Sequence, residues 1–245
     1  MPQVSVVIPV KDEADNVVPL ATEIKNALDG RYDFEIIFVD DGSTDATLAN
    51  LGAYRVASGL GPRLRVVRHA QACGQSTAVW SGAQAARGEL LATLDGDGQN
   101  DPADLPKLIA PLLAADRDPG LMLTIGWRAK RNDDFIRRAS SRLAFAARRW
   151  ILKDDTPDTG CGLKVIRLAD FKALPYFNHM HRFMPALFQR EGCEVVSVPV
   201  NHRERLRGQS KYGLHNRLWV GIVDLFGVSW LIRRASPRVA VHEER

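Results

Sequence analysis

One acidic stretch decides the fold of this chain: Leu94-Asp95-Gly96-Asp97-Gly98-Gln99-Asn100-Asp101-Pro102. The five residues before it, 89–93, have the pattern of a short buried strand. A proline at position 102 with acidic residues beside it is typical of the first turn of a helix. The carboxylates therefore follow the C-terminal end of a strand, which is where open α/β sheets bind their ligands.

The spacing of the acids in this stretch suits a metal ion. Asp95 and Asp97 are two residues apart, so in an extended turn both can reach one hard cation, and Gln99 adds a neutral oxygen. A calcium loop is disfavoured, because it needs glycine and glutamate where this chain has Asn100 and Pro106. A solvated acidic turn is the stronger alternative, since Asp, Gly and Asn are ordinary turn residues.

Length and composition limit the class of protein. A chain of 245 residues can form one large α/β domain, with or without an appended segment. Its net charge of +4 suits an anionic partner such as nucleic acid, a nucleotide or a membrane surface. The 3 cysteines show no C-x-x-C spacing, which disfavours a disulfide framework or zinc site and fits a reducing cytoplasm. We see no signal-peptide pattern, and no apolar run of the roughly 18 residues that a membrane span needs.

Strands and helices alternate along the first hundred residues. This pattern predicts an α/β fold with a Rossmann-like, doubly wound, mostly parallel sheet. Ser43 or Thr44 is expected to cap the second helix. A nicotinamide, flavin or P-loop enzyme is disfavoured, because neither G-x-G-x-x-G after the first strand nor G-x-x-x-x-G-K-[ST] occurs. We expect strands at 4–10, 34–39, 64–68 and 89–93, and helices at 17–28, from about 44 to 58, and from about 76 to 88.

Acids recur where these strands end. Glu13 follows the first strand, and Asp40 and Asp41 follow the second, as Asp95 and Asp97 follow the fourth. Carboxylates in such positions can bind ribose hydroxyls and base edges. A simple turn at Asp41 is the alternative, but the recurrence favours a nucleotide site.

Four separated motifs, in order, resemble one known family. They are Val6-Val7-Ile8-Pro9 with Glu13, Val39-Asp40-Asp41-Gly42-Ser43-x-Asp45, Gly74-Gln75-x-x-Ala78 and Leu94-Asp95-Gly96-Asp97-Gly98-Gln99. This set resembles the family 2 glycosyltransferases with the GT-A fold, and among them the dolichol-phosphate mannosyltransferase group, which glycosylates polyprenyl phosphates. The resemblance covers roughly residues 4–212. It implies a GT-A catalytic domain at 1–212 and a C-terminal membrane-interface helical segment at 213–245.

The resemblance also implies roles for the acids. Mg²⁺ or Mn²⁺ would be held against the donor diphosphate by Asp95, Asp97 and Gln99. The chain departs from the family at Gly96, where alanine is usual, and at Gly98, where a bulkier apolar residue is usual. We expect both glycines to give the metal loop extra backbone freedom. The nucleotide sugar would contact Pro9, Glu13, Asp40, Asp41 and Asp95.

Basic residues beyond the sheet suit the acceptor. Guanidinium groups pair with phosphate in a bidentate way. We therefore expect Arg128, Arg131 and Arg138, the last within a helix predicted at 133–152, to bind the acceptor phosphate. Asp158 belongs with them by resemblance, because it opens a family-like D-x-G-x-[GC]-x-[RK] segment. A plain solvated basic face is the alternative. No aromatic platform or groove-entering motif is evident, so we expect no nucleic-acid partner.

A basic segment follows an edge strand predicted at 194–200. It ends in G-x-S-K-Y, and the resemblance implies that Arg203, Ser210 and Lys211 close over the diphosphate, a flexible basic connector being the alternative. Two nearby features are given no role in the site. Cys161 has no obvious His and Asp partners for a thiol nucleophile. The histidines at 179 and 181 would not share a helix face, so we do not read them as metal ligands.

Residues 218–232 form an apolar run between arginines. As a helix it would be about 22 Å long, short of a hydrocarbon core of about 30 Å. We expect it to lie in a membrane interface, with a buried core helix or a dimer contact as the alternative. Attachment would be peripheral, or supplied by a membrane-anchoring partner or a homo-oligomer.

These expectations combine into one predicted function. The protein would be an inverting glycosyltransferase on the cytoplasmic face of a membrane. It would move a hexose from a nucleotide-diphosphate sugar, with GDP-mannose favoured, to a dolichyl- or undecaprenyl-type phosphate. A phosphate acceptor is already ionised and needs no strong base, so catalysis would be electrostatic, through Asp97, Arg128, Arg131 and Lys211. The alternatives are a UDP-linked glucose, aminosugar or uronic acid donor, a soluble saccharide acceptor, and a non-catalytic nucleotide-sugar-binding subunit.

Overall fold

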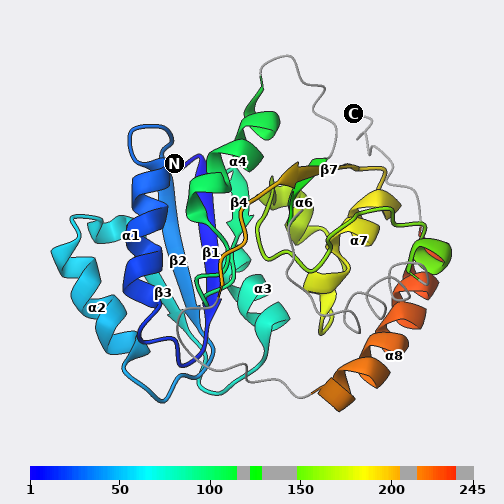
Figure 1. Cartoon of the computed structure of the whole chain (residues 1–245), viewed down its shortest axis with the longest axis horizontal. Coiled ribbons are helices and arrows are strands. Elements are labelled where there is room, and N and C mark those ends of the chain that lie inside the picture. Colours follow the sequence, from blue (N-terminus) through cyan, green and yellow to red (C-terminus); the bar gives the residue numbers. More distant parts are fainter. Residues whose placement is uncertain (115–121, 129–147, 205–213, 236–245) are drawn as a thin grey trace, which may run out of the picture.

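A mixed sheet of seven strands organises the part of the chain that the structure describes (Figure 1). The computed structural model describes residues 1–114, 122–128, 148–204 and 214–235, with side chains left out at 214–220. The strand order is β3-β2-β1-β4-β6-β5-β7. The strands are β1 (Val4–Val10), β2 (Phe34–Asp40), β3 (Leu64–Arg68), β4 (Leu90–Thr93), β5 (Met122–Trp127), β6 (Lys164–Arg167) and β7 (Glu194–Pro199).

All of these strands are parallel except β6, which runs antiparallel to β4 and to β5. In the register of the sheet, Val10 lies opposite Asp40 and Val7 lies opposite Thr93. The carboxyl ends of β1, β2 and β4 therefore meet at one edge, as the sequence predicted. That edge is where the acidic loops gather.

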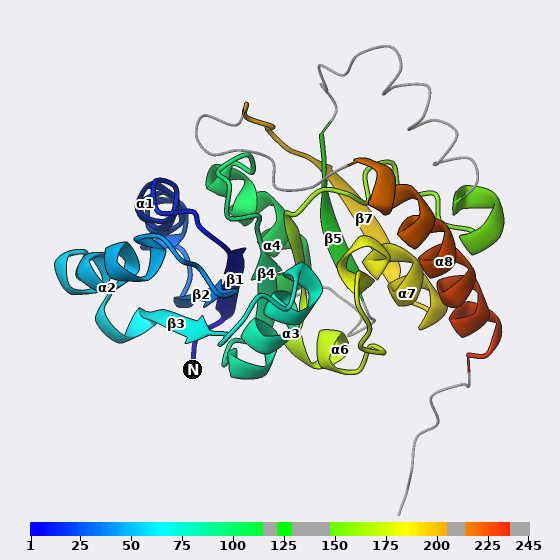
Figure 2. The same cartoon turned by 90° about the horizontal axis from the view of Figure 1, so that it is seen from below.

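Helices cover both faces of the sheet (Figures 1 and 2). Residues of α1, α2 and α4 belong to the hydrophobic cluster on one face, and residues of α3, α6, α7 and α8 belong to the cluster on the other. The helices are α1 (Val17–Leu28), α2 (Thr47–Ala57), α3 (Gln75–Ala85), α4 (Leu105–Leu113), α6 (Leu168–Lys172), α7 (Met184–Arg190) and α8 (Leu214–Arg233), with 3-10 turns η1 (Gly61–Arg63), η2 (Pro102–Asp104) and η3 (Met180–Arg182).

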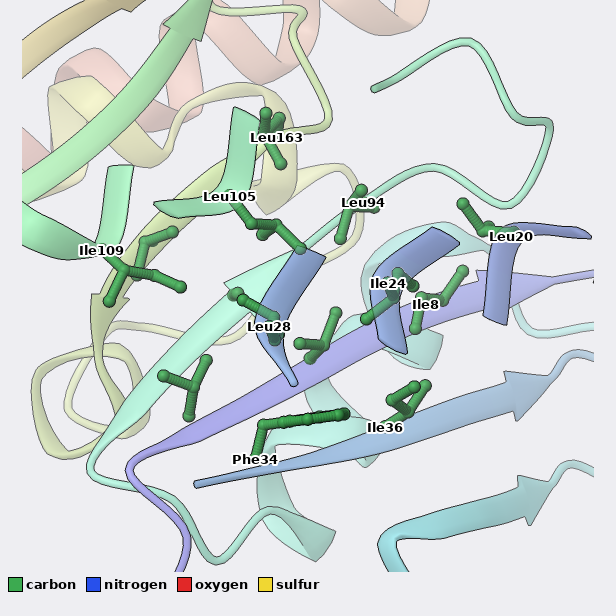
Figure 3. Packing of buried hydrophobic residues seen from close by; sticks show 14 of the residues in the cluster. Ile8, Leu20, Ile24, Leu28, Phe34, Ile36, Leu94, Leu105, Ile109 and Leu163 are labelled. Carbon is green, nitrogen blue, oxygen red and sulfur yellow. The ribbon is translucent and has the colours of Figure 1, made fainter. Parts of the chain in front are cut away.

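The two clusters follow from the alternation of side chains along each strand. Ile8 and Ile36 face α1, where Ile24 packs over them (Figure 3), whereas Val7 faces α3. The small residues of α3 allow a close approach, since a Cβ at Gly82 would lie 2.3 Å from Val7 Cγ1. Both faces of the central strands are therefore buried, which explains their continuous apolar runs.

Most of the predicted elements are confirmed to within a residue or two, including β7 at the edge of the sheet. The predicted cap of α2 was wrong. The Thr47 N–H donates to the carboxylate of Asp45 at 2.9 Å, whereas the Ser43 hydroxyl accepts the Asp12 N–H at 2.8 Å. Only 148–152 of the helix predicted at 133–152 are described, and they are helical.

None of the helices in the described ranges is both long and apolar enough to cross a membrane. The apolar run at 218–232 lies inside α8, which extends over 20 residues. α8 packs against α7, and Val228 of α8 is buried in the second cluster. A division of the chain at residue 212 stays a prediction.

Candidate active site

The acidic loop after β4 is held by hydrogen bonds on both of its arms. Gln75 Nε2, at the start of α3, donates to Asp95 Oδ1 at 2.8 Å, and the Asp95 N–H donates to Asn100 Oδ1 at 3.0 Å. The Gln99 N–H donates to Asp97 Oδ1 at 3.1 Å. Asp95 and Asp97 therefore lie on two arms of one loop, and each arm is held by hydrogen bonds.

The electrostatics of this loop favour a bound cation. Burial raises the pKa of Asp95, and the neighbouring charge of Asp97 raises it further, against the opposing effect of Lys164 and Arg128. Lys164 and Arg128 thus do not fully offset the burial of Asp95 and its repulsion by Asp97. A divalent ion would supply the missing positive charge. The oxygens of Asp95, Asp97 and Gln99 are of the type that Mg²⁺ and Mn²⁺ prefer. The residues present therefore fit such an ion.

Glycine occupies positions 96 and 98 of the loop for reasons other than the backbone freedom that we expected. A Cβ at Gly96 would lie 2.8 Å from the carbonyl oxygen of Pro9 and 2.6 Å from Val10 Cγ1. Position 96 therefore has no room for a side chain, since the loop presses against the end of β1. Gly98 has a φ of +75°, a conformation that other residues rarely adopt. The expectation of extra backbone freedom was wrong for Gly96, which packs closely against the end of β1, whereas Gly98 forms a left-handed turn.

Gly162 lies against the metal loop from the other side. A Cβ there would stand 2.2 Å from Asp95 Oδ2, and the Thr93 hydroxyl donates to the Gly162 carbonyl at 2.7 Å. The segment around Asp158 therefore forms a wall of the same site. Sequence reasoning placed Asp158 near the acceptor but gave no sign of this contact with Asp95.

Arg128 and Asp158 are each other's partners. Arg128 Nε lies 2.6 Å from Asp158 Oδ2, and Nη2 lies 2.8 Å from Oδ1. Their side chains are 14% and 5% exposed. The hydrogen bonds that Arg128 donates to Asp158 raise the pKa of Arg128, although burial opposes this. Asp158 therefore orients a cation, while Arg131 and Arg138, expected beside it, lie outside the described residues.

Lys164 is a functional candidate that sequence reasoning did not single out. Its side chain is buried and donates to the carbonyl oxygen of Cys161. Burial lowers its pKa, and Cys161, Asp95 and Asp158 oppose this change. The basic position that ends the D-x-G-x-[GC]-x-[RK] segment was the available signal. Cys161 itself is buried, which raises the pKa of its thiol and keeps it protonated.

The predicted nucleotide residues lie at the ends of β1 and β2. Asp40 is 0% exposed, and its Oδ1 accepts the Ser43 N–H at 3.2 Å. Within the described residues its Oδ2 makes no hydrogen bond, and Arg68 Nε is 3.8 Å away. A buried carboxylate oxygen without a donor is costly, so this atom suits an N–H from a ligand. Nearby, Glu13 Oε2 accepts from Asn16 Nδ2 at 2.6 Å.

Asp41 has a different environment from Asp40. Its oxygens accept the N–H groups of Cys73 and Gly74 and contact His69 Nδ1, each at 2.8 Å. Burial by itself would raise the pKa of Asp41, but these bonds lower it. Asp41, His69 and Cys73 are close enough together to hold a metal, yet the carboxylate already has three partners, the Cys73 and Gly74 N–H groups and His69. Asp41 therefore shapes the 69–74 turn beside the predicted nucleotide pocket.

Arg203 lies in ion pairs that were not expected. Its Nη1 is 2.6 Å from Glu23 Oε2 on α1, and its Nη2 is 2.7 Å from Asp101 Oδ1. The expected contact with a diphosphate would require these pairs to break. Ser210 and Lys211, predicted to act with Arg203, lie outside the described residues.

The two histidines that we did not read as metal ligands contact different partners. His181 Nδ1 lies 2.6 Å from the Ser76 hydroxyl at the start of α3, and burial lowers its pKa to about 3, helped by the charges of Lys164 and Arg182. His179 Nδ1 lies 2.9 Å from Asp224 Oδ2 of α8. Both therefore tie neighbouring elements together.

A mostly parallel sheet with acids at the ends of β1, β2 and β4 defines the class as an α/β protein whose two-carboxylate loop lies at the edge where such sheets bind ligands. Comparison with known proteins gives the family. The model of "Glycosyl transferase family 2" matches residues 5–174, and the chain belongs to this family. The protein is therefore a glycosyltransferase, as the sequence predicted.

Two curated relatives are similar over most of the chain. Dodecaprenyl-phosphate galacturonate synthase of Rhizobium johnstonii is 37% identical over 240 residues, which are 96% of this chain and 69% of the relative. Undecaprenyl-phosphate 4-deoxy-4-formamido-L-arabinose transferase of Edwardsiella ictaluri is 35% identical over 212 residues, which are 86% of this chain and 63% of the relative. The chain thus spans about two thirds of the length of these relatives.

Solved structures agree on the fold. Glucosyl-3-phosphoglycerate synthase of Mycobacterium tuberculosis in complex with UDP has a TM-score of 0.65 at 22% identity, covering 94% of this chain and 80% of that one. The same enzyme in complex with Mn²⁺, UDP-glucose and phosphoglyceric acid has a TM-score of 0.64. The sheet and its flanking helices are therefore those of the GT-A fold.

Proposed function

We propose that this protein transfers a sugar from a nucleotide-diphosphate donor to a polyprenyl phosphate, with inversion at the anomeric carbon. The observation that carries the proposal is the joining of two sites at one wall: Asp95 of the metal loop contacts Gly162, and Arg128 is oriented by Asp158 in the same segment. A donor diphosphate and an acceptor phosphate can thus be held side by side. The polyprenyl-phosphate names of the two relatives support the acceptor class.

The donor sugar differs from the one favoured by the sequence alone. GDP-mannose was favoured, but the relatives are named for galacturonate and for 4-deoxy-4-formamido-L-arabinose. They support the alternative, a UDP-linked uronic acid or aminosugar, which we now propose. Asp40 Oδ2 accepts no hydrogen bond within the described residues and would accept an N–H from a base edge. Uracil and guanine both offer one, so this residue does not decide between them.

A divalent ion, Mg²⁺ or Mn²⁺, would be held by Asp95, Asp97 and Gln99. When bound, it would neutralise the donor diphosphate and the charge that grows on it as the sugar leaves. The protein itself would supply the rest of the positive charge. Lys164 stays buried close to these carboxylates.

The acceptor side needs a fixed cation rather than a base. A phosphate monoester is largely ionised at neutral pH, because its second pKa is about 6. Asp158 takes two donors of Arg128, and a guanidinium has five N–H groups in all. The remaining donors would bind the acceptor phosphate and aim its oxygen at the anomeric carbon. Positioning of this kind contributes to the rate without a proton transfer.

The membrane would be reached through α8, which lies at the periphery of the molecule (Figure 2). Val223, Phe226 and Trp230 are 68%, 65% and 61% exposed, and their spacing of three and four residues places them on one helix face. Val228, on the opposite side of α8, is buried, as is Ser229. An apolar face followed by two exposed arginines at 233–234 suits a lipid interface. We propose peripheral attachment there, on the cytoplasmic face, with an anchoring partner or a homo-oligomer as the alternative.

A donor screen with purified protein tests this function. UDP-galacturonate, UDP-linked 4-deoxy-4-formamido-L-arabinose, UDP-glucose and GDP-mannose, each radiolabelled in the sugar, would be supplied with Mn²⁺ and with or without undecaprenyl phosphate. The proposal expects label in the lipid phase from a UDP-linked uronic acid or aminosugar, and only with the lipid phosphate. Transfer to a soluble saccharide without lipid phosphate, or no turnover with any donor, would overturn it.

A further inference from the structure

The segment that follows β7 is joined to the metal loop. The Arg203 N–H donates to the Gln99 carbonyl oxygen at 3.0 Å, and Asn100 pairs with His202 in an isolated antiparallel bridge. Residues 201–203 thus run alongside the half of the loop that ends in Gln99. We call these three residues the strap.

The Arg203 side chain ties the strap to two further elements. Its guanidinium contacts Asp101, the residue that ends the metal loop, and Glu23 in the middle of α1. Asp101 also receives the Ala103 N–H at 3.0 Å, where η2 begins. One guanidinium thus joins the metal loop, η2 and α1.

The contact with Asp101 is the more protected of the two. Asp101 has a side chain that is 13% exposed, against 41% for Glu23. Partly buried ion pairs with good hydrogen bonds are screened less than exposed ones. The ion pair of Arg203 with Asp101 therefore restrains the loop more than the ion pair with Glu23 does.

The metal loop needs such a restraint at this end. Its first arm, at Asp95, follows β4 directly and is held by Gln75 and Asn100. The second arm, from Asp97 to Gln99, contains Gly98 in a left-handed turn, and glycine constrains the backbone weakly. The strap supplies hydrogen bonds where the loop's own sequence restrains it least.

We propose that Arg203 is a positioning residue for the metal loop, holding Asp97 and Gln99 at their places through the strap and Asp101. This rests on the proposed function, because it assumes that the loop binds a divalent ion. It differs from a direct contact between Arg203 and the donor diphosphate. Partners of this outer kind typically change metal affinity by roughly 10- to 100-fold when they are removed.

Mn²⁺ binding to the whole chain tests the proposal without any turnover. Free Mn²⁺ would be measured by electron paramagnetic resonance during titration of the protein with saturating UDP present. Arg203→Met and Asp101→Asn should each weaken Mn²⁺ binding about tenfold, and Glu23→Gln should weaken it less. Arg31→Met is the matched control, because Arg31 lines the same shallow pocket of about 290 Å³ as Arg203 and is exposed. It should bind Mn²⁺ as the wild type does.

UDP binding in the absence of metal separates the two roles of Arg203. A positioning role predicts that Arg203→Met binds UDP without metal as the wild type does, with an unchanged circular dichroism spectrum. Wild-type Mn²⁺ affinity in Arg203→Met, or a loss of metal-free UDP binding in that variant, would overturn the positioning role alone. A wild type that binds no Mn²⁺ in the presence of UDP would overturn the metal site and the inference with it.

Discussion

Gly162 and Asp95 touch so closely that any side chain at position 162 would occupy the place of the Asp95 carboxylate. A Cβ there would lie 2.2 Å from Asp95 Oδ2 and 2.4 Å from its Cγ. The two residues come from different parts of the chain, and their contact fixes the distance between the metal loop and the wall that carries Asp158. Position 162 requires glycine, because the Asp95 carboxylate fills the space that a side chain there would need.

Gly162→Ala should therefore displace Asp95. We expect a loss of transfer of at least about 100-fold, since removing or moving one electrostatic group of a reactive centre costs this much or more. The measurement is transfer rate alongside thermal unfolding. Gly160→Ala is a matched control in the same segment, because its nearest contact would be 3.4 Å, to Arg128 Nη2. Equal activity in the two variants would show that Asp95 is not held by this contact.

Asp158→Asn should act on the acceptor through Arg128. The change removes a charge but keeps the shape, so the guanidinium loses its fixed orientation. We expect a KM for undecaprenyl phosphate that is raised about tenfold, with the KM for the donor nearly unchanged. Steady-state kinetics with each substrate varied in turn measures both. A rise confined to the donor KM would place Asp158 on the nucleotide side instead.

Glu35 should make the stability of the fold depend on pH. Burial alone would raise its pKa, but hydrogen bonds from Ser5, Arg65 and the Arg87 N–H outweigh this and lower it. A carboxyl whose pKa is lower in the folded state stabilises the protein above its unfolded pKa of about 4.3, and this contribution is lost as the pH falls through the folded value.

Glu35→Gln should accordingly lower the free energy of unfolding at pH 7, by on the order of 2 kcal/mol. The difference from the wild type should be smaller at pH 3 than at pH 7. Urea unfolding at both pH values measures this. Asp33→Asn, at an exposed carboxylate nearby, is the control and should change little. A constant difference across the pH range would contradict the ion pair as its cause.

Phe226→Ser with Trp230→Ser should release the protein from lipid. Burying a large apolar side chain contributes roughly 1.5–3 kcal/mol, so the double change should weaken binding by a factor of about 100 or more. Flotation with vesicles containing anionic lipid measures the bound fraction. Gly227→Ser is the control on the same helix, where a Cβ would meet open space. Unchanged flotation of the double variant, with both proteins folded, would argue for a protein partner on this face.

The sequence predicted those features that depend on local patterns. Continuous apolar runs such as Val4–Val10 predicted buried parallel strands, because both faces of a central strand are covered. The spacing of Asp95 and Asp97 predicted a shared loop. What it missed depends on contacts between distant segments. No periodic pattern in the sequence indicates the contact of Gly162 with Asp95 or that of Arg203 with Asp101. Gly96 was predicted to be flexible, because nothing in the local sequence shows that Pro9 lies beside it.

The central claim is that a divalent ion binds between Asp95 and Asp97 and carries the charge of the departing diphosphate. Anomalous diffraction from crystals soaked with Mn²⁺ and UDP tests it most directly. We predict one strong Mn²⁺ peak within coordination distance of both carboxylates, and no such peak in crystals of Asp97→Ala. An empty loop, with the ion instead at Asp41, His69 and Cys73 or absent from the chain altogether, would contradict it.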